Sequence, residues 1–268
     1  MTDLSEDREV EKARYNKRAE RVVTSDTSNA LCADGAISIS PELRTPYLEY
    51  EALIRIHAHL GSEILDVCCG NGLHSLIASK AGSNITALDI AENNLILVNA
   101  RALRAGVNIT TVVANAERVP LPDSSFDVVT CAGSLSYLDH SKVLAEINRI
   151  LKYGGVFICV DSLNHNPIYR FNRWIHYLLG DRTKSTLLKM PTMRVFDDFE
   201  REIGPVVCRS FHGIFSFLIP LLKPLLGAST TGRVLDYLDL SFPALRSQAF
   251  KFVAVVQKKS KTLPLKPS

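Results

Sequence analysis

The sequence predicts an α/β protein built on a doubly wound, mainly parallel sheet. Residues 63–72 join an apolar strand to a glycine turn, and a helical pattern over residues 73–81 follows at once. The alternation of apolar runs with helical patterns continues to about residue 162, as expected for successive βα units. With 268 residues, 46% of them hydrophobic, the chain is long enough for one large domain with additions.

The first sixty residues predict helices and a loop outside the sheet. Residues 6–22 are highly charged and rich in good helix formers, which indicates a solvated helix. The polar stretch 24–40 predicts a loop, Pro41 opens the next element, and residues 47–60 show the apolar recurrence of a helix packed against the sheet. We therefore expect an N-terminal helical cap over residues 1–60.

The glycine turn at Gly70 and Gly72 indicates a ligand site, because glycine lets the backbone approach a ligand closely. Residues 70–75 match two of the three glycines of the dinucleotide pattern, with Ser75 at the third, so an NAD-linked oxidoreductase is one interpretation. Asp66 argues against it, since a carboxylate in this corner would repel a pyrophosphate. The same carboxylate suits a cationic ligand, such as one that carries an amine and a sulfonium.

Polar groups also follow the next strands. Residues 85–90 predict a second strand that ends at Asp89, about where an acid grips ribose hydroxyls in nucleotide-binding sheets. The β-branched run 108–114 predicts a third strand, which Asn115, Ala116 and Glu117 follow. Residues 119–125 then predict a loop rich in proline and serine, and residues 126–131 a fourth strand that ends at Cys131.

These motifs resemble those of the class I S-adenosylmethionine (SAM) methyltransferases. Asp66, Gly70 and Gly72 match the family's D-x-G-x-G-x-G, while Cys68 replaces its first glycine, as in some quinone methyltransferases. Residues 119–131 are similar to the family's L-P-F-P-D-x-S-F-D-x-V. The resemblance implies a seven-stranded Rossmann-like sheet with an antiparallel last strand, SAM as the cofactor, and methyl transfer as the reaction.

The resemblance also implies which residues hold SAM. Asn115 stands where the family usually has an Asp that meets the adenine amino group, and its side chain keeps an acceptor oxygen for that role. Tyr15 and Arg18, in the N-terminal helix, become candidate lid residues over the cofactor. The remaining candidates follow the first four strands: Asp66, Cys68, Gly70, Gly72, Asp89, Ile90, Ala116 and Cys131.

The later elements complete the expected sheet. Residues 141–152 predict a helix that a serine cap opens at Ser141 and that ends at Gly154 and Gly155. Strands are expected at 156–161, 204–211 and 250–257 as the fifth, sixth and seventh. The SAM-binding domain is then 61–257, with helical insertions at about 163–200 after the fifth strand and 212–246 after the sixth. Residues 258–268 are basic and simple enough for a flexible tail.

The insertions are expected to build the acceptor site, because both follow strands near the rim of the pocket. The first holds a cluster of rings and guanidinium groups that suits a hydroxyl of a sugar, a glycolipid or an aromatic compound: Tyr169, Arg170, Arg173, Trp174, His176 and Tyr177. His165, four residues past the fifth strand, is the candidate base, and Tyr137, after the fourth, the candidate acceptor-positioning group. His57, His59 and His74 are interpreted as structural.

Composition limits the other classes. A net charge of +3 and the lack of a basic-aromatic stripe disfavour nucleic acid as a partner. The charged N-terminus lacks the apolar core of a signal peptide, and the six cysteines show no metal-type pairing, so we expect no metal and a cytoplasmic location. Peripheral membrane contact through 212–228, a catalytically silent partner-binding role, and the oligomeric state stay open.

Overall fold

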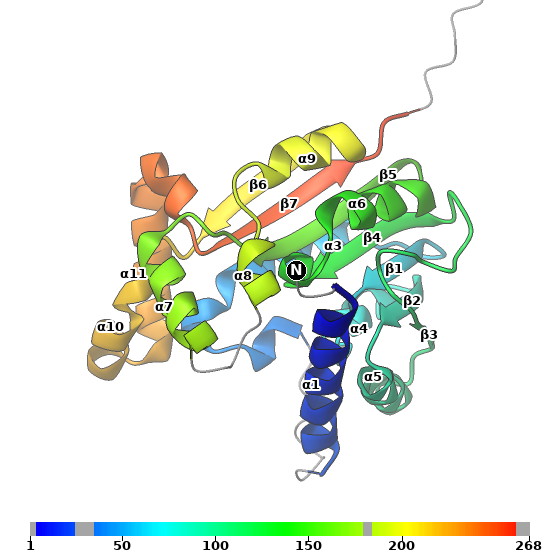
Figure 1. The fold of residues 1–268 in the computed structure, drawn as a ribbon, viewed down its shortest axis with the longest axis horizontal. Coiled ribbons are helices and arrows are strands. Elements are labelled where there is room, and N and C mark those ends of the chain that lie inside the picture. Colours follow the sequence, from blue (N-terminus) through cyan, green and yellow to red (C-terminus); the bar gives the residue numbers. More distant parts are fainter. Residues whose placement is uncertain (1–3, 25–34, 179–183, 261–268) are drawn as a thin grey trace, which may run out of the picture.

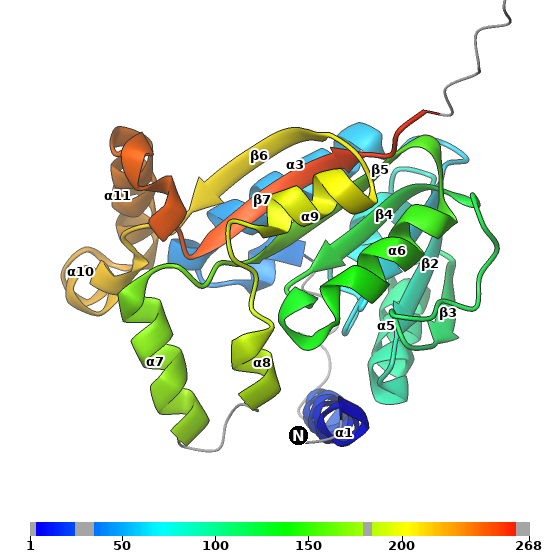
Figure 2. The same cartoon turned by 45° about the horizontal axis from the view of Figure 1, so that its top comes forward.

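The fold is a seven-stranded mixed sheet with helices on both faces (Figures 1 and 2), seen in a computed structural model that describes residues 4–24, 35–178 and 184–260. The strand order is β3-β2-β1-β4-β5-β7-β6, and β7 runs antiparallel to both of its neighbours. The strands are β1 (Glu63–Val67), β2 (Asn84–Asp89), β3 (Ile109–Val113), β4 (Phe126–Ala132), β5 (Leu151–Ser162), β6 (Val206–His212) and β7 (Lys251–Gln257). The predicted sheet, including its antiparallel last strand, is confirmed.

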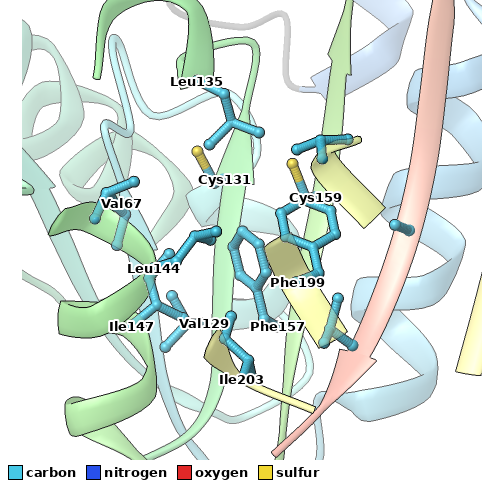
Figure 3. Close-up of a cluster of buried hydrophobic side chains, with 14 of the residues drawn as sticks. Val67, Val129, Cys131, Leu135, Leu144, Ile147, Phe157, Cys159, Phe199 and Ile203 are labelled. Carbon is cyan, nitrogen blue, oxygen red and sulfur yellow. The ribbon is translucent and has the colours of Figure 1, made fainter. Parts of the chain in front are cut away.

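Alternation along the strands gives each face of the sheet its own core, because successive side chains point to opposite faces. On one face, Val129 and Phe157 pack with α6 (His140–Ile150) and α9 (Val195–Glu202), as Figure 3 shows. On the other face, Val128 and Ile158 pack with α3 (Thr45–His57) and α4 (Ser75–Ser79). Both faces are therefore buried, as a parallel sheet requires.

The N-terminal helix α1 (Leu4–Thr24) lies against α5 (Glu92–Ala105) rather than against the sheet. The backbone N–H of Asn93, in the first turn of α5, donates to Oδ1 of Asn16 at 3.2 Å. Short 3-10 helices at Gly35–Ser38 (η1) and Pro41–Leu43 (η2) lead into α3. The stretch 25–34, where the sequence predicts a loop, lies outside the described residues.

The insertions form helices, most of which lie at one end of the sheet, on the left in both Figure 1 and Figure 2. The first insertion contributes α7 (Pro167–Leu178) and α8 (Lys184–Leu188), ahead of α9. The second contributes η4 (Ser216–Leu218), α10 (Ile219–Leu226), α11 (Ala228–Ser241) and η5 (Pro243–Gln248). His212 belongs to β6 rather than to the second insertion.

Two sequence-based expectations about the segment around α6 are wrong. The helix begins at His140, with Asp139 as its N-cap: the Asp139 carboxylate accepts from the backbone N–H of Lys142, so Ser141 is not the cap. The helix also ends at Ile150, and Gly154 and Gly155 lie inside β5. The chain turns directly into the strand because Leu151 pairs with Phe126 of β4, ahead of an irregularity in that ladder.

The flexible tail predicted at residues 258–268 does not begin at Lys258. Lys258 is buried, and its Nζ donates to the backbone carbonyls of Asn148 and Leu151 at 2.5 and 2.7 Å. These bonds attach the end of β7 to the C-terminus of α6. Residues 261–268 lie outside the described part of the chain.

Candidate functional site

A cavity of about 330 Å³ lies at the carboxyl ends of β1, β2 and β4, where doubly wound sheets place their ligands. Its volume is within the range of small-molecule sites. Five of the candidate cofactor residues line this cavity, namely Tyr15, Asp66, Cys68, Gly70 and Asp89, and so does Tyr137, the candidate acceptor-positioning residue. The fold thus brings predicted site residues that lie far apart in the chain around one cavity.

Asp66 is buried in the cavity wall and held by two hydroxyl groups. Its Oδ2 accepts from Oγ of Ser75 at 2.5 Å, and its Oδ1 accepts from Oγ1 of Thr130 at 3.1 Å. Burial raises the pKa of Asp66 above its ordinary value, and the hydrogen bonds oppose that shift only in part. Ser75, which replaces the third glycine of the dinucleotide pattern, is therefore one of the two residues that hold the carboxylate.

Asp89 ties the glycine turn to the end of β2. Its Oδ2 accepts from the backbone N–H of Gly70 at 2.8 Å, while its Oδ1 accepts from the N–H of Ala91 at 2.8 Å. Burial raises the pKa of Asp89 as well, against the effect of these bonds. Glycine is also required at position 72 of this turn, because a Cβ there would lie 2.8 Å from a methyl carbon of Val98.

Cys68 occupies a backbone conformation that favours glycine, with φ of 54°. Its side chain lines the cavity and packs against the core on the α6 face. Burial raises the pKa of its thiol well above the ordinary value, which disfavours the reactive thiolate. The cysteine at the position of the family's first glycine thus keeps the turn but adds a side chain at its inner edge.

Helix α1 contributes Glu11 and Tyr15 to the wall of the cavity. The rings of Tyr15 and Tyr137 meet edge to face with centroids 5.9 Å apart. Nη2 of Arg14 donates to the hydroxyl oxygen of Tyr137 at 3.2 Å. Burial, together with Tyr137, raises the pKa of Tyr15, so its hydroxyl stays protonated. The side chain of Arg18, the second predicted lid residue, lies outside the described residues.

Other candidates lie outside the cavity wall. Asn115 uses its Oδ1 to accept from the backbone N–H of Glu117 at 3.0 Å, and Ala116 and Cys131 are buried in the core. Gly72 and Ile90 are also absent from the wall. These assignments stay predictions that rest on the family resemblance alone.

The charges around the cavity fit a cationic ligand. Three carboxylates line it, those of Glu11, Asp66 and Asp89, and none of its described lining residues is Lys or Arg, although Arg14 forms an ion pair with Glu11 at 2.7 Å. The negative charge of Asp66 and Asp89 would repel a pyrophosphate, whereas it would favour the ammonium and sulfonium groups of SAM. The residues present therefore fit SAM better than a dinucleotide.

A second cavity of about 450 Å³ adjoins the first and is bounded by the insertions. The two share four lining residues: Ile39, Tyr47, Gly133 and Tyr137. Arg173 of α7, Asp236 of α11 and Lys251 of β7 reach the second cavity from separate parts of the chain. Nζ of Lys251 lies 5.0 Å from the ring centroid of Tyr47, a cation–π distance.

A histidine–carboxylate pair stands at the edge of the second cavity. His212, the last residue of β6, lines the space, and its Nε2 lies 2.7 Å from Oε2 of Glu49 in α3. Burial acts to raise the pKa of Glu49, but hydrogen bonds from His212 and Ser210 hold it below its ordinary value. Sequence reasoning missed His212, although its place at the end of a strand is the signal that singled out other residues.

His165 and His74 lie where their predicted roles, base and structural residue respectively, would not place them. Nε2 of His165 accepts from the backbone N–H of Met193 at 2.8 Å, and the residue lines neither of the two cavities. His74, interpreted as structural, lines the first cavity, where Glu51 holds its Nδ1 at 3.1 Å and its ring stacks on Tyr47. A catalytic role for His165 stays a prediction.

The aromatic and basic cluster of the first insertion divides between two sides of α7. Tyr169 and Arg173 turn inward, where the hydroxyl of Tyr169 donates to the carbonyl of Gly213 at 2.6 Å. Arg170 and Trp174 are exposed. The cluster therefore contributes Arg173 to the second cavity, while its outward members face away from it.

Comparison with known proteins identifies the central part of the chain. Residues 65–159 match the family described as a methyltransferase domain. The demethylmenaquinone methyltransferase of Listeria monocytogenes serotype 4a (strain HCC23) is 34% identical over 137 residues, covering 48% of this chain and 58% of that protein. The sterol 4-C-methyltransferase strm-1 of Caenorhabditis elegans is 32% identical over 146 residues, covering 50% and 43%. The chain thus spans about half the length of these curated relatives.

Solved structures share the fold over most of the chain. A geranyl diphosphate C-methyltransferase from Streptomyces coelicolor A3(2) superposes with a TM-score of 0.59 at 15% identity, covering 88% of this chain and 84% of that one. The cyclase SpnF superposes with a TM-score of 0.58 at 16% identity, covering 81% and 83%. Residues 65–159 therefore form a methyltransferase domain, and the seven-stranded sheet that contains them has the fold expected of a class I SAM-dependent methyltransferase.

Proposed function

We propose that this protein transfers the methyl group of SAM to a hydroxyl of a small molecule held in the second cavity. The observation that carries the proposal is the junction of the two cavities at Gly133 and Tyr137, directly after β4. A ligand in the acidic cavity and a ligand in the larger one would meet there. Proximity of two bound reactants supplies roughly 7–11 kcal/mol toward such a transfer.

On the cofactor side, residues of the first cavity would bind and orient SAM. Asp66 and Asp89 supply negative charge, and Gly70 brings backbone close to the ligand. SAM, when bound, supplies a methyl group on a good leaving group. Tyr15 and Tyr137, with Arg14 on the hydroxyl of Tyr137, cover the junction and limit the access of water to it.

On the acceptor side, His212 is the base that the geometry favours. Glu49 holds its Nε2, which leaves Nδ1 for the acceptor; no hydrogen bond to Nδ1 is found among the described residues. A neutral imidazole held in this way can take the hydroxyl proton as the methyl group is transferred. Tyr137 would position the acceptor, as the sequence predicts, and His165 remains the alternative base if its bond to Met193 opens.

The lining of the second cavity supports a polar acceptor such as a sugar, a glycolipid headgroup or a hydroxylated aromatic compound. Asp161, Asp236 and Asp239 line it, each already accepting a hydrogen bond from the protein, and Tyr47 and Phe250 offer ring faces. Demethylmenaquinone and sterol, the acceptors in the relatives' names, are more apolar than this wall. We therefore favour a hydroxyl on the polar part of the acceptor.

The test is methyl transfer from SAM labelled in its methyl group. The purified protein is incubated with labelled SAM and, separately, with a polar extract and a lipid extract of cells, and the label is followed into products. His212→Asn is the matched control for base-dependent transfer. Label in a hydroxyl-bearing product supports the proposal; SAM binding with no transfer from either extract would favour a silent binding subunit. Reduction of NAD instead would favour an oxidoreductase.

A further inference from the structure

Helix α7 turns its apolar side outward. The exposed side carries apolar residues at helical spacing: Ile168, Phe171, Trp174, Ile175 and Leu178. Phe171 and Trp174 are 61% and 50% exposed, and their rings stack at 6.1 Å. Arg173 is buried on the opposite side, where its Nη1 donates to the carbonyl of Leu163 at 2.8 Å. An amphipathic helix normally buries its apolar stripe, so this orientation indicates a contact surface.

Helices α10 and α11 add apolar surface at the same end of the sheet, as Figures 1 and 2 both show. None of the residues of α10 is buried, although its sequence is Ile-Pro-Leu-Leu-Lys-Pro-Leu-Leu. Leu221 and Leu225 are 64% and 74% exposed, and Leu240 of α11 is 82% exposed. Nζ of Lys223 donates to the buried Glu42 at 2.6 Å and so ties α10 to the body of the protein. Leu221 and Leu225 therefore face away from the body of the protein.

The charges of this end are basic. Helices α7 and α10 contain no Asp or Glu, and between residues 205 and 248 the acidic residues are Asp236 and Asp239. Both of these line the acceptor cavity, where Asp236 accepts from Thr45 and Asp239 from backbone N–H groups. Arg170, Arg233 and Arg246 are exposed. Exposed leucines and aromatic rings among arginines suit an anionic lipid surface, which attracts cations and accepts apolar side chains.

We propose that α7, α10 and α11 bind the surface of an anionic lipid bilayer. No helix of the described residues has the length and apolar character to cross a bilayer, so the contact is with its surface. Two of these helices also wall the acceptor cavity, α7 through Arg173 and α11 through Leu235. An acceptor anchored in lipid would then reach the cavity beside its own membrane. That second step rests on the proposed function; the binding itself does not.

The test uses the chain's single tryptophan, Trp174, which lies on the proposed surface. The full chain is mixed with vesicles of phosphatidylcholine alone or with phosphatidylglycerol added, and its emission and co-sedimentation are measured. We expect a blue shift of emission and sedimentation with the anionic vesicles, both weakened by salt. The variant Leu221→Asp with Leu225→Asp should bind at least about tenfold more weakly, because each leucine loses its burial in lipid.

Leu103→Asp is the matched control. Leu103 is 84% exposed on α5, which lies near the other end of the sheet in Figure 1, so its change should leave vesicle binding unaltered. Binding that is absent, or that falls equally in the control, would overturn the proposal. So would a shift of Trp174 emission that follows protein concentration without lipid, since that result assigns the surface to a second copy of the chain.

Vesicle binding and SAM binding are measured separately, so either proposal can fail while the other stands. SAM binding, measured by calorimetry on the same α10 variant, should equal that of the unchanged protein and also shows that the variant is folded. Vesicle binding without SAM binding would contradict the proposed function and leave the surface assignment standing. SAM binding and methyl transfer without vesicle binding would support the proposed function and contradict the surface assignment.

Discussion

Nε2 of His212 and Oε2 of Glu49 lie 2.7 Å apart, and the histidine lines the larger cavity while the carboxylate stands behind it. In this arrangement a carboxylate fixes the orientation of an imidazole and stabilises its protonated form. We predict that His212→Asn lowers kcat for the acceptor by about 10²–10⁴-fold, as expected for loss of a base, with SAM affinity unchanged. Steady-state kinetics and calorimetry measure the two effects.

His165→Ala is the histidine control for that experiment. Sequence reasoning assigns the base to His165 and expects its loss to lower turnover more than about tenfold. The hydrogen bond from Met193 to its Nε2 leads us to expect normal turnover once the fold is intact. A large loss in His165→Ala together with full activity in His212→Asn would reverse the assignment.

Alanine at the two glycines of the turn is predicted to affect stability and SAM binding to different extents. Gly72 has φ of 75° and its Cβ would lie 2.8 Å from Val98, so Gly72→Ala should lower the free energy of unfolding by about 2 kcal/mol or more. Gly70 has φ of 54°, but a Cβ there meets no described atom within 4 Å. Gly70→Ala should therefore cost about 1 kcal/mol and chiefly weaken SAM binding. Urea unfolding and calorimetry on both variants provide the check; equal losses of stability would contradict it.

Cys68 is predicted to be more easily replaced by glycine than by alanine. Both changes remove the sulfur, but only glycine relaxes the positive φ of 54°. Cys68→Gly should be about 1 kcal/mol more stable than Cys68→Ala. Unfolding midpoints in urea compare the two; an alanine variant as stable as the glycine variant would show that no strain resides at this position.

Binding of SAM is predicted to weaken as pH is lowered. Burial raises the pKa values of Asp66 and Asp89 above their ordinary 3.8 in the free protein. A cationic ligand favours the ionised carboxylates, so binding releases protons, and affinity should rise with pH through the raised pKa values and level off above them. Calorimetry between about pH 5 and 8, in buffers of different ionisation enthalpy, measures the release. In Asp66→Asn the pH dependence should shrink; uptake of protons on binding would contradict the sign.

The sequence predicted the sheet well because its signals are local. Asp66 and Asp89 each interrupt an apolar run where a strand ends, and the structure places both at the first cavity. The limits of α6 were missed because a tertiary contact decides them: Leu151 pairs with β4, so the helix stops ahead of the glycines.

The acceptor side was predicted less well, because its residues come together only through the fold. Sequence position made His165 look closer to the reaction than His212, since it follows the fifth strand. The antiparallel placement of β7 between β5 and β6, however, brings β6 beside α3, and so His212 beside Glu49. Arg173 likewise sits among exposed neighbours in sequence, yet it turns inward to the cavity.

The central claim is that the acidic cavity beside Asp66 and Asp89 binds SAM, and calorimetric titration of the pure protein tests it most directly. We predict saturable binding of SAM and of its demethylated product, lost or much weakened in Asp89→Asn, because Asp89 holds the N–H of Gly70 and lines the cavity. We predict no binding of NAD under the same conditions. Saturable binding of NAD, with none of SAM, would contradict the account.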